Sequence, residues 1–297
     1  MNTQLPNLGL TGILGKGGTA TVYRGVQLST GREVAVKVLE SDFVKSPEDI
    51  TRFVNEAKAC ARFKHKNIVR VYDAGEAQGI YYFVMELING YTFAAYLARK
   101  KQIAVEDVLI ILESVVEALR YAWQTYRVIH CDIKPDNLMV DADGTIKVMD
   151  LGIAKSLLTV TRESAESAEE IMGTPAYMSP DQIYDLRDID CRSDIYALGA
   201  TAYHLLTGVS LFPGKTDQQV VDSHIGASFA RDPRRLAPRI PYALALILNR
   251  MLAKDRNLRY PNWETLSADI QRLYAGEPLL ATPLKPGESS VGLASDL

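Results

Sequence analysis

Hydrophobic positions follow a period of two in the first part of the chain. In "REVAVKVLE", Val34, Val36 and Val38 fall on one face of an extended segment, and the residues between them fall on the other. Just before this segment, "GILGKGGTATVYRG" places a glycine cluster between two short apolar runs. The pattern predicts β-strands over residues 8–39, with a tight glycine turn between two of them.

A helical period comes next. Ser46 can cap a helix, Pro47 suits its first position, and Asp49 stands three residues after the cap. Glu56 lies on the margin of an apolar stripe whose members share helical spacing: Ile50, Phe53, Ala57, Cys60 and Ala61. Two apolar segments follow, "NIVRVYDAGE" and "GIYYFVMELI", and they predict two strands joined by a turn.

After about residue 90 the pattern is mainly helical. A long amphipathic helix is predicted over residues 105–126. Further periodic segments predict helices at 193–207 (ended by Gly208), 216–225, 242–253 and 263–274. We therefore divide the chain near residues 88–90 into a strand-rich part and a mainly helical part.

The last residues lack any sustained period. The stretch "GEPLLATPLKPGESSVGLASDL" carries three prolines and scattered serine and glycine. Such a composition is typical of segments that cannot bury enough apolar surface to fold. Residues 276–297 are predicted to be a linker or a disordered tail.

Composition narrows the classes of function. The chain has 297 residues, 47% hydrophobic and 23% charged, which is ordinary for a globular protein with a sizeable core. The net charge of −3 lacks the basic excess of a nucleic-acid partner, so we expect no nucleic acid. Cys60, Cys131 and Cys191 have no CxxC spacing, which favours a reducing compartment over disulfides or zinc.

Targeting signals are also missing from the pattern. No basic segment precedes an apolar core at the start, and no apolar run is long enough to span a membrane. We expect no membrane segment in this chain and a cytoplasmic location. The chain could equally be the cytoplasmic part of a longer membrane-anchored protein.

The glycine cluster and a nearby lysine suggest phosphate binding. Gly15, Gly17 and Gly18 would let backbone N–H groups approach phosphates without hindrance from Cβ atoms. Lys37 shares a strand face with Ala35, so a flat base could pack on Ala35 while the ammonium reaches phosphate. A plain tight turn and a solvent-exposed lysine are the alternatives, and each pattern taken alone favours them.

The segment "HCDIKPDN" at residues 130–137 precedes a predicted hairpin. In "LMVDADGTIKVMD", Asp143–Gly144 is typical of a two-residue turn between apolar arms. Extending the register of that turn outward places Asn137 opposite Asp150. An amide oxygen and a carboxylate are suitable ligands for Mg²⁺. The alternative is that both residues only end the strands.

Taken together, these features resemble a known family. They occur in the order Gly15-x-Gly17 with Val22, "VAVK" ending in Lys37, Glu56, "HCDIKPDN", "DLG" from Asp150, "GTPAYMSPD" from Gly173, and "SDIYALG" around Asp194. The chain resembles the protein kinase superfamily, most of all the bacterial (Hanks-type) serine/threonine protein kinases. The resemblance covers about residues 8–275, and the ordered set is far more specific than each motif alone.

The resemblance implies a fold and a division of labour. It implies a two-lobed α+β fold, with an antiparallel sheet and one helix in an N-lobe (8–88), a mainly helical C-lobe (89–275), and ATP between them. The residues implied to bind ATP are Leu14, Gly15, Lys16, Gly17, Gly18, Val22, Ala35, Lys37, Glu56, Met85, Glu86 and Ile88. Among them, Lys37 would pair with Glu56, Met85 would gate the adenine pocket, and the backbones of Glu86 and Ile88 would bond adenine.

The catalytic roles come from the same resemblance. Asp132 would accept the proton of the acceptor hydroxyl, and Lys134 would steady the transferring phosphate. Asn137 and Asp150 would hold Mg²⁺, for which Mn²⁺ could substitute. Asp194 would accept backbone N–H groups of the catalytic loop. His130 is interpreted as a packing residue, and Thr174 would contact Asp132 and Lys134.

Several positions depart from the family pattern without removing a catalytic group. Ala20 replaces a third glycine, Leu151 replaces a phenylalanine, and Asp181 replaces a glutamate whose expected ion-pair partner is Arg259. Cys131 stands where many kinases carry an arginine that binds a phosphate on the activation loop. A thiol cannot do this. We therefore expect intact chemistry, and we hypothesise that phosphorylation at Ser156, Thr159, Thr161, Ser164 or Ser167 does not act through residue 131.

The expected activity is Mg-dependent transfer of the γ-phosphate of ATP to serine or threonine of protein substrates, including the kinase itself, in bacterial signalling. Self-association for autophosphorylation is one possible arrangement. Lys134 and the "GTP" at Gly173–Pro175 favour serine or threonine over tyrosine. A pseudokinase scaffold is one alternative, and the presence of Lys37, Asp132, Asn137 and Asp150 weighs against it. A small-molecule phosphotransferase is another, and the "GTPAYMSPD" segment weighs against that.

Overall fold

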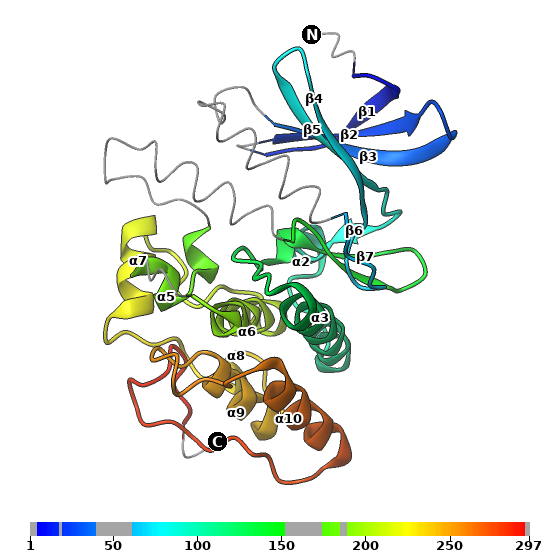
Figure 1. Ribbon diagram of the computed structural model, residues 1–297. Coiled ribbons are helices and arrows are strands. Elements are labelled where there is room, and N and C mark those ends of the chain that lie inside the picture. Colours follow the sequence, from blue (N-terminus) through cyan, green and yellow to red (C-terminus); the bar gives the residue numbers. More distant parts are fainter. Residues whose placement is uncertain (1–4, 18–19, 40–60, 152–173, 185–188, 295–297) are drawn as a thin grey trace.

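A strand-rich lobe and a helical lobe lie one above the other (Figure 1). The structure is a computed structural model that describes residues 5–17, 20–39, 61–151, 174–184 and 189–294. The predicted helix that carries Glu56 lies outside these residues, as do Gly18, Gly173 and the five activation-loop hydroxyls named above.

The N-lobe is built on a five-stranded antiparallel sheet in the order β1-β2-β3-β5-β4. The strands are β1 (Leu8–Lys16), β2 (Ala20–Gln27), β3 (Arg32–Leu39), β4 (Val71–Ala77) and β5 (Ile80–Glu86). Val34 and Val36 are fully buried on one face, beside Tyr82 and Val84. Ala35 is buried in a different cluster on the other face, so the predicted alternation is confirmed.

The C-lobe begins with a short sheet, β6 (Tyr91–Thr92), β7 (Leu138–Val140) and β8 (Ile146–Val148). Its helices are α2 (Phe93–Lys100), α3 (Val105–Tyr126), α5 (Pro180–Ile183), α6 (Cys191–Thr207), α7 (Asp217–Ile225), α8 (Pro233–Leu236), α9 (Tyr242–Met251) and α10 (Trp263–Ala275), with 3₁₀ turns η2 (Pro135–Asn137) and η3 (Pro175–Tyr177). None of the described helices is long and apolar enough to cross a bilayer.

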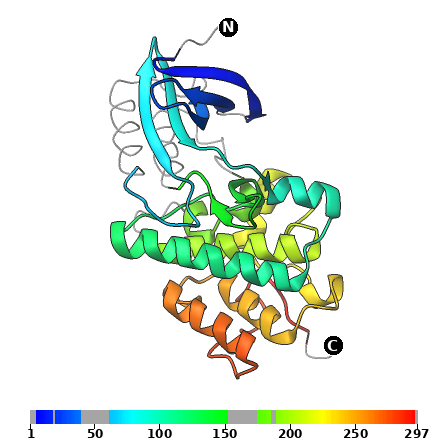
Figure 2. The ribbon, with the colours of Figure 1, turned by 90° about the vertical axis from the view of Figure 1, so that its right-hand side faces the viewer.

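The apolar faces of α2, α3, α6, α9 and α10 meet in one core, and apolar residues of α7 and α8 pack with part of α6 in a second cluster. Helix α3 runs across the width of the C-lobe (Figure 2) and packs against α6, α10 and β8. Leu112, Leu119, Ile195 and Leu244 are all at most 1% exposed within this core. The predicted helix at 105–126 is therefore confirmed, and α6 ends at Gly208 (φ +76°) as predicted.

The hairpin between β7 and β8 corrects the predicted register by one residue. Asn137 lies opposite Met149 rather than Asp150, because the Met149 N–H donates to the Asn137 carbonyl (2.9 Å). The turn is a three-residue loop closed by Asp141 and Thr145, not a two-residue turn at Asp143–Gly144.

The chemistry of the turn explains the difference. The Asp141 carboxylate accepts from the N–H of Ala142 (2.7 Å), and the Asp143 carboxylate accepts from the N–H of Thr145 (2.8 Å). Gly144 takes φ +86°, and a type I turn followed by a left-handed glycine is a common hairpin loop. Aspartate side chains thus stabilise the longer loop, and Asp150 comes one position beyond the residue opposite Asn137.

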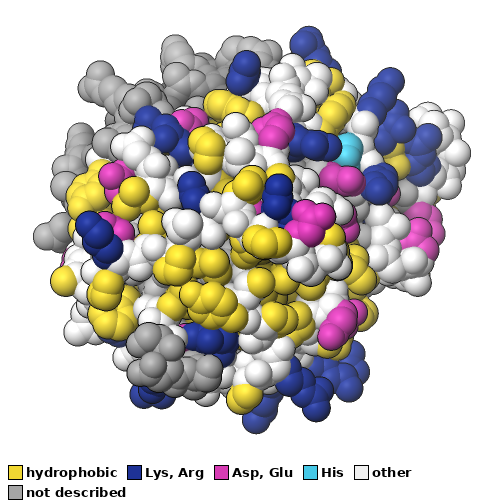
Figure 3. All heavy atoms as spheres, turned by 90° about the horizontal axis from the view of Figure 1, so that it is seen from below, with side chains coloured by type: hydrophobic (Ala, Val, Ile, Leu, Met, Phe, Trp, Pro, Cys, Tyr) yellow, Lys and Arg dark blue, Asp and Glu magenta, His cyan; other side chains and the backbone are white. Residues whose placement is uncertain are grey.

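The segment after α10 is also unlike its prediction. Residues 276–294 lie against the C-lobe, running back beneath α9 toward α8 (Figure 1). Ala281, Ser289, Ser290 and Val291 are each less than 5% exposed. A linker or disordered tail would leave such residues in water, so this part of the prediction needs correction. Seen from below, apolar side chains gather over the middle of the C-lobe surface, with charged ones around and between them (Figure 3).

Candidate active site

The carboxylate of Asp194 fixes the backbone just before Asp132. Asp194 lies in the first turn of α6 and is 2% exposed. It accepts hydrogen bonds from the N–H of His130 (2.7 Å) and of Cys131 (2.9 Å). The fully buried His130 ring contacts the Met149 carbonyl through Nε2 (2.8 Å). Hydrogen bonds to an ionised acceptor are stronger than neutral ones, so this loop is firmly held.

Cys131 is held through its backbone in a conformation that residues with a Cβ rarely adopt. Its φ is +66°, and its side chain is buried. Nε2 of Gln182 donates to the Cys131 carbonyl (2.8 Å), while Oε1 of Gln182 accepts from the N–H of Ser179 (3.2 Å). Gln182 therefore caps α5 and holds the residue that precedes Asp132.

The Asp132 carboxylate contacts two polar side chains, and one of them also contacts Thr174. Nζ of Lys134 is 2.9 Å from Oδ2 of Asp132 and donates to Oγ1 of Thr174 (2.8 Å). Nδ2 of Asn137 donates to the same Oδ2 (2.8 Å) and to the Asp132 carbonyl (2.8 Å). Among the described residues both contacts of the carboxylate use Oδ2. Oδ1 of Asp132 is therefore the oxygen that can receive a further proton donor.

Lys37 joins the N-lobe sheet to the other candidate carboxylate. Its Nζ lies 2.7 Å from Oδ2 of Asp150, which has φ +56°. Burial disfavours the charged form of Asp150, but the nearby ammonium of Lys37 outweighs it. The pKa of Asp150 is therefore below its ordinary value, with smaller contributions from His130 and Lys134. A carboxylate that stays ionised at neutral pH is a ready ligand for a cation.

An apolar surface lies beside these charged groups. Ala35, Val69 and Met85 are buried in one cluster, against which Val22, Leu87, Ile88 and Met149 pack. Four of the predicted nucleotide residues, Val22, Ala35, Met85 and Ile88, thus come together from separate parts of the sequence. The Glu86 N–H donates to the Arg70 carbonyl (2.8 Å), so this N–H is already engaged and is not available to a base. A flat apolar surface with few polar groups suits a nucleobase.

Comparison with known proteins now gives the family. Residues 9–269 match the family described as the protein kinase domain. The chain belongs to the protein kinase family. The predicted family and the predicted two-lobed α+β fold are both confirmed.

Several relatives of this kinase domain are named as bacterial serine/threonine-protein kinases. Serine/threonine-protein kinase PrkC of Bacillus subtilis (strain 168) is 36% identical over 267 residues, and PknB of Mycolicibacterium smegmatis is 35% identical over 269 residues. The alignments cover 90% and 89% of this chain, but 40% and 42% of the relatives. The chain thus spans about two fifths of the length of these curated relatives.

A solved structure agrees on the fold. The crystal structure of the Mycobacterium tuberculosis PknI kinase domain superposes with a TM-score of 0.71. The match covers 91% of this chain and 97% of that chain at 24% sequence identity. At this identity the likeness concerns the fold alone.

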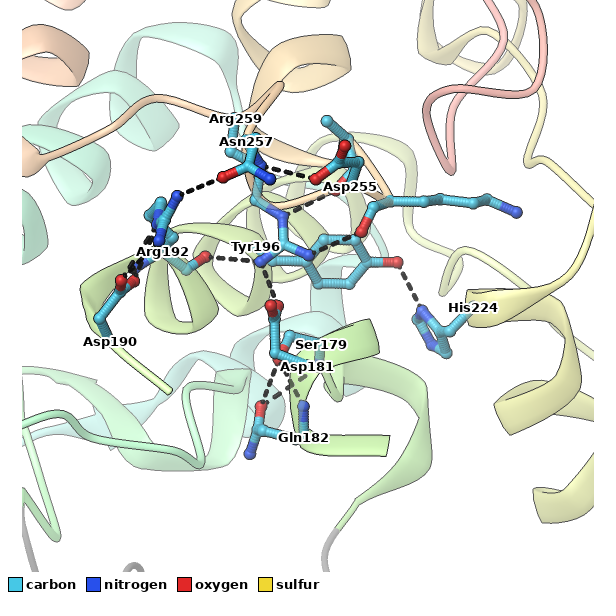
Figure 4. Close-up of polar contacts among 12 residues, drawn as sticks. Ser179, Asp181, Gln182, Asp190, Arg192, Tyr196, His224, Asp255, Asn257 and Arg259 are labelled. Carbon is cyan, nitrogen blue, oxygen red and sulfur yellow. Dashed lines mark hydrogen bonds and ion pairs between the residues drawn. The ribbon is translucent and has the colours of Figure 1, made fainter. Parts of the chain in front are cut away.

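The kinase domain carries the expected ion pair behind its catalytic loop. Arg259 pairs with Asp181 as predicted, and both side chains are almost fully buried. The guanidinium of Arg259 also lies over the Tyr196 ring, 5.1 Å from its centroid, and donates to the Ala253 carbonyl (2.7 Å). These contacts join α5, α6 and the segment before α10 (Figure 4).

The described residues of the glycine loop lie at the surface of the kinase domain. Leu14, Gly15, Lys16 and Gly17 are exposed at the tip of the β1–β2 hairpin, where Gly15 pairs with Val22. The Gly17 N–H donates to the Ala20 carbonyl (2.9 Å).

Four contributors to the site were missed by sequence reasoning. Val69, Leu87 and Met149 complete the apolar cluster, and Gln182 supports Cys131. Met149 directly precedes Asp150 in a strand-like run, which could have indicated its place beside the site. The capping-box pattern "SPDQ" could likewise have indicated the role of Gln182. Val69 has no distinctive local signal.

Proposed function

We propose that this chain is the catalytic domain of a serine/threonine protein kinase that transfers the γ-phosphate of ATP to protein hydroxyls. The bacterial relatives are named for this activity. The observation that carries the proposal is the set of contacts around Asp132, which orient one carboxylate oxygen and leave the other for an acceptor. Little covalent chemistry is needed, because phosphoryl transfer depends mainly on positioning and on neutralising charge.

The acceptor side of the mechanism uses three residues. Oδ1 of Asp132 would accept the proton of a serine or threonine hydroxyl. Lys134, which bridges Asp132 and Thr174, would neutralise charge on the transferring phosphate. Thr174 is the first described residue of the segment that leads to α5, and we propose that this segment binds the acceptor. Lys134 therefore connects the acceptor-binding segment to Asp132, the proposed general base. This contact supports serine or threonine as the acceptor.

The nucleotide side uses the apolar cluster and Lys37. The base would pack between Val22, Ala35 and Met85, and Lys37 would bind phosphate oxygens. Asp150 and Asn137 offer hard oxygen donors that fit Mg²⁺ or Mn²⁺, since Mg²⁺ takes one or two protein oxygens together with substrate phosphates. When bound, the ion would neutralise charge between the phosphates. Glu56, the proposed partner of Lys37, lies outside the described residues.

The proposal is tested by changing Asp132 to Asn. Phosphate transfer from labelled ATP to serine and threonine peptides should fall by about 10²–10⁴, the usual contribution of a general base. Asp136→Asn is the matched control, because Asp136 is an exposed carboxylate of the same loop. Equal rates for the wild type and Asp132→Asn would contradict the proposal.

Other outcomes would identify the alternatives. ATP binding without turnover would indicate a pseudokinase scaffold, and transfer only to small molecules would indicate a different acceptor class. Tyrosine peptides should remain unmodified. Self-phosphorylation between two copies would make the rate per molecule rise with protein concentration, whereas a concentration-independent rate would restrict it to one chain.

A further inference from the structure

The kinase domain continues beyond the family match into a packed segment, residues 277–294, which we call the C-terminal strap. The match ends at residue 269, within α10. The fully buried Asp269 carboxylate accepts from the N–H groups of Leu280 (2.6 Å) and Ala281 (2.9 Å), and also from the Tyr260 hydroxyl (2.7 Å). A buried carboxylate with three donors fixes the start of the strap.

The later part of the strap is inserted between α9 and the segment before α8. The Ser290 N–H donates to the Leu252 carbonyl (2.9 Å), and the Ser290 carbonyl accepts from the Ala230 N–H (2.8 Å). Nδ2 of Asn249 donates to the Val291 carbonyl (2.9 Å). Since Ser290 is fully buried, its backbone is paired on both sides, as in an added strand.

The Ser290 side chain begins a buried polar chain. Its Oγ lies 2.7 Å from the Tyr196 hydroxyl, which lies 2.6 Å from Nδ1 of His224 in α7. Tyr196 and His224 are fully buried. Burial lowers the pKa of His224 to about 4, so the ring is neutral at pH 7. Figure 4 shows the Tyr196 hydroxyl directed at His224.

His224 faces the segment next to Thr174. Helix α7 packs against η3, and the carbonyls of Pro175 and Ala176 lie beside the ring and favour its protonated form. With Nδ1 facing Tyr196, Nε2 is the nitrogen left for these carbonyls, although it does not reach hydrogen-bond geometry. The same apolar cluster contains Tyr196 and Val291, with Tyr177 packed against it.

We propose that the C-terminal strap positions the acceptor-binding segment, residues 174–178, through Ser290, Tyr196 and His224. Thr174 bonds Lys134, so the position of this segment sets where a bound hydroxyl meets Asp132. The role in peptide binding rests on the proposed function. The structural coupling between the C-terminal strap and residues 174–178 is independent of that function.

Ser289 provides a matched control within the strap. It is 2% exposed, and its Oγ donates to the Asn249 carbonyl (2.8 Å) and accepts from the Val291 N–H (3.2 Å). Ser289→Ala therefore removes the same group, at the same burial, from a site that faces α9. It should destabilise the fold about as much as Ser290→Ala does, without touching the Tyr196–His224 pair.

The experiment compares Ser290→Ala, Tyr196→Phe and Ser289→Ala in the full chain. For the first two, the KM for a serine or threonine peptide should rise about threefold to tenfold, the size of one lost buried hydrogen bond. The KM for ATP should stay unchanged. Amide hydrogen exchange within residues 174–184 should speed up in these two variants and not in Ser289→Ala.

Each outcome has one meaning for the proposal. Unchanged peptide KM and exchange in Ser290→Ala would overturn it, as would equal effects in Ser289→Ala, which would indicate general destabilisation. If the wild type does not phosphorylate peptides, the proposed function fails. The exchange of residues 174–184 then still tests whether the strap positions them.

Discussion

The two sides of the proposed nucleotide site are built in different ways. On the C-lobe side, the loop that carries Asp132 is held by Asp194 and Gln182, both less than 10% exposed. On the N-lobe side, Leu14 is 52% exposed, and Gly15 is held mainly by its strand pairing with Val22. The groups proposed to act on the acceptor are therefore preorganised, whereas the described residues near the tip of the glycine hairpin, 14–17, are exposed.

This difference separates two kinds of mutational effect. Buried charged and polar groups are costly to leave without partners, so changes behind the catalytic loop should reduce stability as well as turnover. The exposed hairpin has little packing to lose, so changes there should alter nucleotide binding alone. The variants below test that separation.

The largest stability effect is expected for Arg259→Met. Removing the guanidinium leaves the buried Asp181 carboxylate without its partner, and breaking such a pair typically costs about 3–5 kcal/mol. Denaturant unfolding would measure the loss. The double variant Asp181→Leu/Arg259→Met should recover much of it, because no uncompensated charge is left. A double variant as unstable as the single one would indicate that packing of Arg259 on Tyr196 is the main contribution.

A smaller loss, about 1.5–3 kcal/mol at neutral pH, is expected for Lys37→Met, since its ammonium bonds the carboxylate of Asp150. The contribution depends on pH because Lys37 holds the pKa of Asp150 below its ordinary value of about 3.9. A depressed pKa gives stability that is present above that value and lost as the pH falls through the folded-state pKa.

The pH series therefore has a defined direction. The difference in unfolding free energy between the wild type and Lys37→Met should be full at pH 7 and shrink as the pH falls toward the folded-state pKa of Asp150. Lys16→Met is the control, since Lys16 is exposed on the hairpin and should show no such trend. A difference that stays constant down to pH 3 would mean that the ion pair does not contribute.

Gln182→Leu is expected to cost about 1–3 kcal/mol, because it removes the hydrogen bond to the buried Cys131 carbonyl and the side-chain acceptor for the Ser179 N–H. Turnover should fall as well, since Cys131 precedes Asp132. Gln182→Glu separates the two contacts: it keeps an oxygen for Ser179 but has no donor for Cys131. If Gln182→Glu turns over substrate as fast as the wild type, the hydrogen bond from Gln182 to the Cys131 carbonyl does not position Asp132, the proposed general base.

The sequence allowed the regular elements and the motif residues to be predicted. The period of α3 gave its bounds, and the family resemblance correctly paired Asp194 with the catalytic loop and Asp181 with Arg259. These features depend on repeated apolar positions or on an ordered set of motifs.

The two corrected predictions depend on polar contacts that no period reveals. The register of the β7–β8 hairpin is set by Asp141 and Asp143, whose carboxylates cap the turn. Ser289 and Ser290 of the C-terminal strap are buried. Their hydroxyl groups can be buried because they form hydrogen bonds with the Asn249 carbonyl and the Tyr196 hydroxyl. Burial of that kind follows from tertiary contacts and not from the hydrophobicity of the segment.

The smallest effect is expected for Gly15→Ala on the N-lobe side. A Cβ atom at Gly15 would meet no atom of the described residues within 4 Å, and its φ is not positive, so stability should change by no more than about 0.5 kcal/mol. The KM for ATP should nevertheless rise about threefold, because the methyl group would hinder approach of the backbone to phosphates.

Gly12→Ala is the matched control: it lies on the same strand, with equally open space, but farther from the hairpin tip. Equal KM values for the two variants would show that Gly15 does not face the nucleotide. A loss of stability in Gly15→Ala would show that the hairpin is more tightly packed than its exposure suggests, and the contrast between the two sides of the site would then be lost.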